Sequence, residues 1–319
     1  MIKKIYKIII SCCLVIACCL TLNANVFAAN NNCADQIYNC DNLPQQFDEN
    51  VTFDAIEDDI LNYIETMGLN IEIGSSEYLE LMYSFLYDNV DNVTELTSRY
   101  FGDYASVYVV RAQEIIANNS INTYDSESEN YNISLTGTIQ QAKQQNINYQ
   151  EQLENDVSIA PLSTNASYDV SKAQKYAEAY ALSWNYVYGR YQSDCTNFAS
   201  QIVNYAGMPM VSGEWQFNGN DTAQYTWNVA HAFTEYWTLV RGYNGGDYTS
   251  RSSVNQKASP GDFVAYMRYD TYAIWHVTFV QSKLNGEIYI SQHTTDRYNE
   301  KWNDISINHD SCYIIIKFT

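Results

Sequence analysis

The sequence predicts an α+β fold, in which a mainly helical N-terminal region precedes a domain where helices pack on an antiparallel sheet. Apolar residues make up 46% of the 319 residues, an ordinary share for a globular protein, and this excludes wholesale disorder. Apolar side chains recur at helical spacing in the first half of the chain, whereas short apolar runs bounded by turn residues fill the C-terminal part. The length allows two domains.

The charge of the chain is strongly negative and unevenly distributed. Its formal net charge is −20, so we expect no nucleic acid partner. Residues 29–167 hold 23 acidic and 3 basic residues, whereas residues 168–319 hold 14 and 11. We therefore predict an acidic, mainly helical region at 29–155, a linker at 156–167 and a second domain at 168–319. A prosegment, a targeting module and a spacer are all compatible with the acidic region.

The chain begins with the layout of a secretory signal peptide, which we expect at residues 1–28. Three lysines precede an apolar run, and small residues form a cleavage site that ends at Ala28. The run is short for a membrane span. We therefore expect a secreted protein, with no stable membrane insertion once the signal is removed. Lipid attachment at Cys18 is a lesser alternative.

Three helices are predicted in the acidic region. Asp54 is expected to cap the first, Ser75–Ser76 to begin the second, and Val93–Ile116 to contain the third. Residues 131–155 are rich in Gln and Asn, and their pattern supports no assignment.

Four cysteines lie outside the signal segment. Cys33 and Cys40 are close enough in sequence to form a local disulfide, which export permits. Cys312 precedes the apolar run Tyr313–Ile316 and is expected to be a small buried residue on a strand. Cys195 has no local partner, so a Cys195–Cys312 bridge is the alternative to a free thiol.

Cys195 is predicted in the first turn of a helix. Ser193 or Asp194 can cap this helix, an apolar stripe follows, and Gly207 is suited to end it. The free backbone N–H groups and the dipole of a helix N-terminus favour a thiolate. A cysteine at this place can attack a carbonyl while nearby N–H groups hold the oxyanion.

Two histidines are predicted to meet at the open end of a hairpin. His276 is expected to begin a strand that continues through residues 277–280, and Asn285–Gly286 is a strong hairpin turn. The returning strand, residues 287–291, ends beside His293. Because the open ends of paired strands lie together, we expect the two histidines to be neighbours, arranged as a base and its orienting partner.

These features together resemble the putative amidase domain family, which is related to the CHAP and NlpC/P60 cell-wall hydrolases. The resemblance covers about residues 168–319 and rests on the runs DCTNFASQ (194–201) and SQHT (291–294), the Gly261–Asp262 turn and His276 on a strand. It implies a papain-like α+β fold that hydrolyses amide bonds in peptidoglycan peptides.

By position, the resemblance implies Cys195 as nucleophile, His276 as base and His293 as the third member of the site. Gln292 and Asp296 compete with His293 for the third place. Candidates for contacts with the substrate or the oxyanion are Tyr186, Gln192, Asp194 and Gln292.

The interval between the nucleophile and the base is long for this family, so Glu214–Asn255 is expected to be an inserted lid or substrate loop. Trp215, Trp227 and Trp237 lie in it. They either floor a binding groove or pack in the core.

We therefore expect a secreted cysteine amidase or endopeptidase that uses no cofactor and no metal. No H-E-x-x-H motif supports a zinc site, and no G-x-S-x-G motif supports a serine hydrolase. Two alternatives stay open: a general secreted thiol protease on protein substrates, and a non-catalytic surface or wall-binding protein. The sequence determines neither the amide bond that is cleaved nor the oligomeric state.

Overall fold

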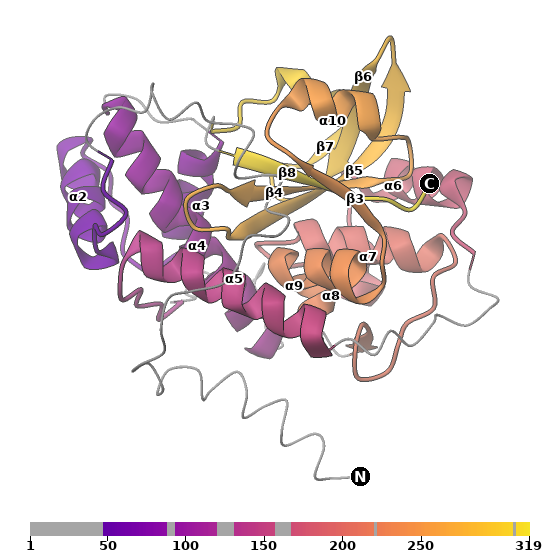
Figure 1. Cartoon of the computed structure of the whole chain (residues 1–319), viewed down its shortest axis with the longest axis horizontal. Coiled ribbons are helices and arrows are strands. Elements are labelled where there is room, and N and C mark those ends of the chain that lie inside the picture. Colours follow the sequence, from indigo (N-terminus) through magenta and orange to yellow (C-terminus); the bar gives the residue numbers. More distant parts are fainter. Residues whose placement is uncertain (1–46, 88–92, 120–130, 157–166, 220–221, 309–310) are drawn as a thin grey trace. The chain divides into compact units, whose positions relative to one another are not determined.

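The computed structural model describes residues 47–87, 93–119, 131–156, 167–219, 222–308 and 311–319 (Figure 1). The expected signal peptide, Cys18, Cys33, Cys40 and most of the expected linker lie outside the described residues. Among the helices that are described, none combines the length and the apolar character needed to cross a bilayer.

The first part of the described chain is helical. Its helices are α2 (Phe53–Thr66), α3 (Ser76–Leu86), α4 (Glu95–Asn119) and α5 (Ile139–Asp156). Helix α3 begins as predicted, since Ser75 Oγ accepts a hydrogen bond from the N–H of Tyr78. Helix α2 does not use the predicted cap. Thr52 Oγ1 accepts a hydrogen bond from the N–H of Ala55 and so caps the helix. Asp54 lies in the first turn, where its negative charge interacts favourably with the helix dipole.

The second part alternates helical segments with strands. Its helical segments are α6 (Val170–Tyr180), η2 (Tyr186–Tyr188), α7 (Cys195–Tyr205), α8 (Tyr225–Asn228), α9 (Ala230–Glu235), the π-helical turn η3 (Tyr236–Val240), α10 (Arg251–Lys257) and η4 (Trp302–Asp304). Asp169 caps α6 by accepting the N–H of Lys172. Gly207 follows α7 with φ +111°, a left-handed conformation that suits the predicted end of that helix.

Within the described residues, six strands form one antiparallel sheet in the order β3-β8-β4-β5-β6-β7. They are β3 (Asn244–Tyr248), β4 (Phe263–Arg268), β5 (Ile274–Leu284), β6 (Glu287–Gln292), β7 (Arg297–Lys301) and β8 (Ser311–Ile316). Two short strands, β1 (Phe217–Gly219) and β2 (Thr222–Ala223), pair separately. The predicted α+β class is confirmed, as is the hairpin: Asn285 and Gly286 join β5 to β6 with φ values of 53° and 83°.

Two predictions about this part are wrong. His276 does not begin β5, because the strand already starts at Ile274. The segment Glu214–Asn255 is not a lid, because it supplies α8, α9 and β3 and its side chains enter the core. Its three tryptophans, Trp215, Trp227 and Trp237, are fully buried among the residues that pack on α7, which confirms the core interpretation for them.

The sheet separates two hydrophobic cores. The α3–α4 core contains the buried faces of α2, α3 and α4 together with Tyr266 and Trp275 from the sheet. The α7 core contains the buried faces of α6, α7 and α9 together with Ala265 and Val277. Because alternate residues of a strand point to opposite faces, adjacent residues of β4 enter different cores. In β5 a register shift at Trp275 interrupts this alternation, so Trp275 and His276 lie on the same side of the sheet. The central strands are therefore buried on both sides.

Buried ion pairs join α4 to the end of β4. Arg268 Nε donates to Asp103 Oδ1 at 2.6 Å, and Arg99 makes two hydrogen bonds to Asp270 at 2.8 and 2.7 Å. The side chains of Asp103 and Arg268 are completely buried. Gly102 on α4 leaves room for this arrangement, since a Cβ there would lie 2.9 Å from Arg268 Cζ.

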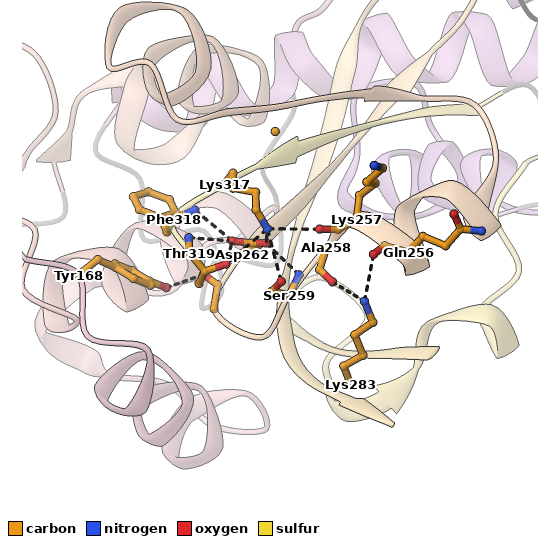
Figure 2. Close-up of polar contacts among 12 residues, drawn as sticks. Tyr168, Gln256, Lys257, Ala258, Ser259, Asp262, Lys283, Lys317, Phe318 and Thr319 are labelled. Atoms are coloured by element: carbon orange, nitrogen blue, oxygen red, sulfur yellow. Dashed lines mark hydrogen bonds and ion pairs between the residues drawn. The ribbon is translucent and has the colours of Figure 1, made fainter. Parts of the chain in front are cut away.

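The Gly261–Asp262 turn holds the C-terminal end of the chain. Figure 2 shows the carboxylate of Asp262 among the groups that it binds. Oδ1 accepts the backbone N–H groups of Phe318 and Thr319, both at 3.1 Å, and Oδ2 accepts the Lys317 ammonium at 2.8 Å. This part of the family motif therefore has a structural role.

Gly102→Ala tests the close contact between α4 and the sheet. In a helix interior this change normally stabilises by about 1 kcal/mol. Here the new methyl group displaces the Arg268 guanidinium from its buried partners, and we expect a net loss of about 1–3 kcal/mol in the free energy of unfolding. Urea denaturation measures it. Asn118→Ala, at an exposed position of the same helix, is the control and should change stability by less than about 0.5 kcal/mol. A stabilised Gly102→Ala protein would contradict the packing described.

Candidate active site

Cys195 is the first residue of α7, as predicted, and only 1% of it is exposed. Burial raises the pKa of its thiol to about 11, although hydrogen bonding by the Thr196 hydroxyl and by the Val277 and Thr196 backbone opposes this. The negative charge of Asp194 raises this pKa further. The thiol is therefore protonated at neutral pH. This differs from the thiolate that a helix N-terminus favours, because burial outweighs the dipole.

Cys195 and Cys312 are not joined by a disulfide, so the alternative Cys195–Cys312 bridge is wrong. Cys312 is buried on β8 in the α7 core, as its apolar surroundings predict.

His276 lies inside β5 and is completely buried. Its ring contacts those of Tyr266 and Trp275, with centroids 5.1 and 5.5 Å away, on the α3–α4 side of the sheet. Burial lowers the pKa of His276 to about 3, although the side chain of Gln292 acts in the opposite direction. Neither ring nitrogen has a fully formed hydrogen bond with any described residue. His276 is therefore a neutral imidazole, and the side chain of Gln292 is the polar neighbour that raises its pKa.

Tyr87, which ends helix α3, lies beside both groups. Its ring is 5.9 Å from that of His276, and a negative charge on Cys195 would act on its hydroxyl and raise its pKa. The Cys195 thiol is in turn next to the backbone of Val277, the residue after His276. The start of α7 and the middle of β5 thus bring the predicted nucleophile and base into one buried cluster.

Gln292 completes this cluster. Its amide nitrogen donates to Tyr87 Oη at 3.1 Å and to Thr295 Oγ1 at 2.9 Å. The Oε1 atom of Gln292 is buried and has no hydrogen bond of acceptable geometry to a described group. The Gln292 side chain raises the pKa of His276. Of the three candidates for the third position, Gln292 is therefore the one that lies next to His276.

The turn that follows Gln292 and His293 has an unusual backbone. Thr294 and Thr295 have φ values of 58° and 62°, the left-handed region that β-branched residues rarely adopt. The amide nitrogen of Gln292 lies 3.1 and 3.3 Å from the carbonyl oxygens of these two residues. Thr294 Oγ1 also accepts the N–H of Asp194 at 2.9 Å, so the turn fixes the start of α7.

His293 has a different set of partners from the expected one. Its Nδ1 contacts Asp194 Oδ2, and its Nε2 donates to the carbonyl oxygen of Tyr180 at 2.8 Å. Its ring stacks on Phe198 of the α7 core, with centroids 4.1 Å apart. Burial disfavours the charged form, but Asp194 outweighs it, so the pKa of His293 is raised. His293 and Asp194 therefore form a buried ion pair beside Cys195.

The expected pairing of His276 with His293 is not what the structure shows. The two rings lie on opposite sides of the sheet, because His293 packs against Phe198 and His276 against Tyr266. Both nitrogens of His293 are engaged elsewhere. Adjacent residues of β6 point to opposite faces, which places the side chain of Gln292 on the His276 side.

The other candidates also occupy definite places. Tyr186 lies in η2 with 80% of its surface exposed, so its ring is in solvent instead of the buried cluster. The amide of Gln192 accepts from Tyr131 Oη at 2.6 Å and donates to the Ser76 carbonyl at 2.8 Å. Asp296 interacts with His293 and not with His276, which speaks against it as the third member. In the part of the chain that is described, no three His, Cys, Asp or Glu residues are grouped to hold a metal ion.

The sequence does not identify the residues of α3 and α4 that reach the cluster. Tyr83 shares a hydrogen bond of 2.5 Å with Ser193, and Gln113 donates to the Trp275 carbonyl oxygen at 2.9 Å. No local signal marks Gln113, because the charged residues Arg111 and Glu114 flank it in the sequence.

Comparison with known proteins agrees with the resemblance. Residues 167–316 match the family model described as a putative amidase domain, which confirms that resemblance and indicates a hydrolase acting on amide bonds. Two uncharacterized proteins of Bacillus subtilis (strain 168) match part of the chain. YjcM is 34% identical over 137 residues, which are 40% of this chain and 31% of YjcM. YhbB is 28% identical over 142 residues, which are 42% of this chain and 44% of YhbB.

The chain thus spans less than half the length of either of these curated relatives. No solved structure matches it.

The ion pair of His293 and Asp194 predicts a pH dependence of stability. The folded chain keeps the proton on His293 to a higher pH than the unfolded chain does, because the pKa of this side chain is 6.5 when the chain is unfolded and is raised by folding. The folded state then binds more protons, so the stabilisation by this pair is complete below 6.5 and is lost as the pH rises through the raised pKa. His293→Gln should cost about 3–5 kcal/mol at neutral pH and less at about pH 9.

Denaturant titrations of both proteins between about pH 7 and about pH 9 measure the difference. His276→Gln is the matched control, because the pKa of His276 is lowered to about 3 and its imidazole is neutral throughout this range. Its effect on stability should not vary with pH there. A pH-independent effect of His293→Gln would argue against the ion pair.

Proposed function

We propose that this protein is a cysteine hydrolase that cleaves amide bonds in cell-wall peptides, with Cys195 as nucleophile, His276 as base and Gln292 as the residue that orients the base. The match of residues 167–316 to an amidase family supports the reaction class. The order of a helix-borne cysteine followed by a strand-borne histidine on an antiparallel sheet supports a papain-like assignment.

One observation carries the residue assignment. His276 is completely buried and neutral, and Gln292 is the polar side chain that raises its pKa. Burial of an ionisable side chain costs free energy, so a histidine with a strongly lowered pKa on a buried strand is a candidate for a functional role. A neutral imidazole beside a protonated thiol is the resting state of a base that will accept the thiol's proton.

The reaction follows from these positions. His276 takes the proton of the Cys195 thiol, and the sulfur attacks the carbonyl carbon of the amide. The first N–H groups of α7 have no partners within the helix and can hold the oxyanion. Protonated His276 then gives its proton to the leaving amine as the C–N bond breaks. Water, activated by His276, hydrolyses the thioester and regenerates the thiol.

The ion pair of Asp194 and His293 supports this chemistry indirectly. A bare carboxylate next to Cys195 would oppose formation of the thiolate. The positive charge on His293 compensates it and also fixes Asp194 at the start of α7. We therefore assign His293 as a positioning residue in place of the third member of the triad.

The substrate and the compartment are further parts of the proposal. The signal-like segment at residues 1–28 supports secretion, and the family resemblance supports peptidoglycan peptides. A secreted thiol protease on protein substrates would use the same residues. The two differ only in which amides they cleave.

Substitution of the nucleophile tests the proposal. Purified full-length chain is incubated with soluble muropeptides and with casein, and mass spectrometry identifies the bonds that are cleaved. Cys195→Ala should abolish cleavage, and His276→Ala should lower kcat by about 10² to 10⁴-fold. Cys312→Ala is the matched control, a buried cysteine on β8 in the α7 core, and should keep the wild-type kcat per folded molecule.

Full amide hydrolysis by Cys195→Ala would show that the nucleophile is elsewhere. Cleavage of casein but not of muropeptides would reject the cell-wall substrate and would indicate a general thiol protease. Muropeptides cleaved only by proteins that keep Cys195 would support both the residue and the substrate.

A further inference from the structure

The groups proposed to react are closed off from solvent. Cys195 has 1% of its surface exposed, and His276 and Gln292 have none. A thiol that attacks a peptide must contact the carbonyl carbon, and a peptide cannot reach an atom that other side chains cover completely. The described arrangement is therefore a closed form of the site.

Two of the side chains that contact the cluster, Tyr83 and Tyr87, come from the end of α3, outside the residues that match the amidase family. Tyr83 Oη shares a hydrogen bond with Ser193 Oγ, two residues before Cys195. Tyr87 Oη accepts a hydrogen bond from Gln292, and its ring lies 5.2 Å from the ring of Trp275. A negative charge on Cys195 would act on both tyrosine hydroxyls, which agrees with the position of this turn beside Ser193 and Gln292.

We infer that the last turn of α3 occupies the acyl-binding subsite of the amidase site, so that Ser193, Trp275 and Gln292 now bind Tyr83 and Tyr87 in place of a peptide. This inference rests on the proposed function. It assigns three substrate contacts, and it implies that turnover requires this turn to move. The ligand class is a peptide amide, whose polar groups take the hydrogen bonds to Ser193 and Gln292 and whose apolar part takes the place of the tyrosine rings on Trp275.

The movement is confined to the end of α3. Helix α4 is fixed to the sheet by the buried ion pairs of Arg99 and Arg268, and by the Gln113 amide, which donates to Trp275 and accepts the N–H of Ala230 at 2.9 Å. Removal of all the helices would uncover the apolar face of the sheet that belongs to the α3–α4 core. Displacement of one turn uncovers the thiol and takes only the side chains of that turn, Tyr83 to Tyr87, out of this core, while the buried faces of α2 and α4 stay in it.

Closure also explains why the thiol is unreactive in this form. The thiolate is the species that reacts with alkylating reagents, and burial raises the pKa of Cys195 to about 11. Displacement of the tyrosines admits water, which removes much of this effect and leaves the favourable position at the start of α7. Opening is expected to increase both access to the sulfur and its fraction of thiolate.

The test measures thiol alkylation in the full-length chain. Wild type and Tyr87→Ala are exposed to iodoacetamide at about pH 8, and peptide mass spectrometry gives separate rates for Cys195 and Cys312. Tyr87→Ala should increase the rate at Cys195 by about tenfold or more and leave that at Cys312 unchanged. Cys312 lies in the α7 core and serves as an internal control for global unfolding. Tyr78→Ala is the matched variant: it removes a buried ring of the same helix that packs on Tyr108, away from the thiol, and should leave Cys195 slow.

Two results would overturn the inference. One is fast alkylation of Cys195 in the wild type, and the other is an equal increase at Cys195 in Tyr87→Ala and Tyr78→Ala. If Tyr87→Ala exposes Cys312 as well, the milder Tyr87→Leu is measured in the same way, and a rate at Cys195 equal to that of wild type rejects the inference. Faster alkylation of Cys195 without any amide hydrolysis would support the inference that α3 covers the thiol and would reject the proposed function. The two failures are therefore distinguishable.

Discussion

Burial of strand β5 on both faces is the constraint on which the rest of the structure depends. Val277 and Phe279 enter the α7 core, whereas Trp275 enters the α3–α4 core. Residues 274–281 of this strand are all buried, so any polar side chain on this part of it is desolvated. His276 is such a side chain. Its neutral imidazole, its lowered pKa and its contacts with aromatic rings all follow from its place on this strand.

The same constraint separates the two histidines that the sequence suggests as a pair. Adjacent residues of a strand point to opposite faces, so the alternation along β6 decides whether Gln292 or His293 meets His276. Ile290 lies in the α3–α4 core, which places the side chain of Gln292 on that side and His293 on the other. His293 then contacts Asp194. The sequence suggests this histidine as a catalytic partner, but in the structure it is the counter-ion of a carboxylate.

Much of the fold is predictable because its signals are local. Asn285–Gly286 specifies the hairpin, Gly207 ends α7 and Ser75 begins α3, each through backbone conformations or caps that involve a few neighbouring residues. The positions of Cys195 at a helix start and of His276 on a strand are local in the same sense. The partners of these residues are not, since Tyr87 is distant in sequence from Gln292 and Gln113 from Trp275. The periodicity of apolar residues along the sequence does not indicate which helix packs on which face of a sheet.

The negative charge of the N-terminal region does not predict its structural role, which is to form part of the hydrophobic core. Its acidic side chains favour the interpretation of a separate, solvated module, yet its apolar side chains supply most of the helical side of the α3–α4 core. The two properties are compatible, because a helix presents different residues on its two faces. Three acids of α2, Asp54, Asp58 and Asp59, are exposed, whereas Ile56, Ile60 and Ile64 are buried. A region that is half of a hydrophobic core cannot act as a freely detachable shield, so control of the site through α3 must operate by local displacement within a folded chain.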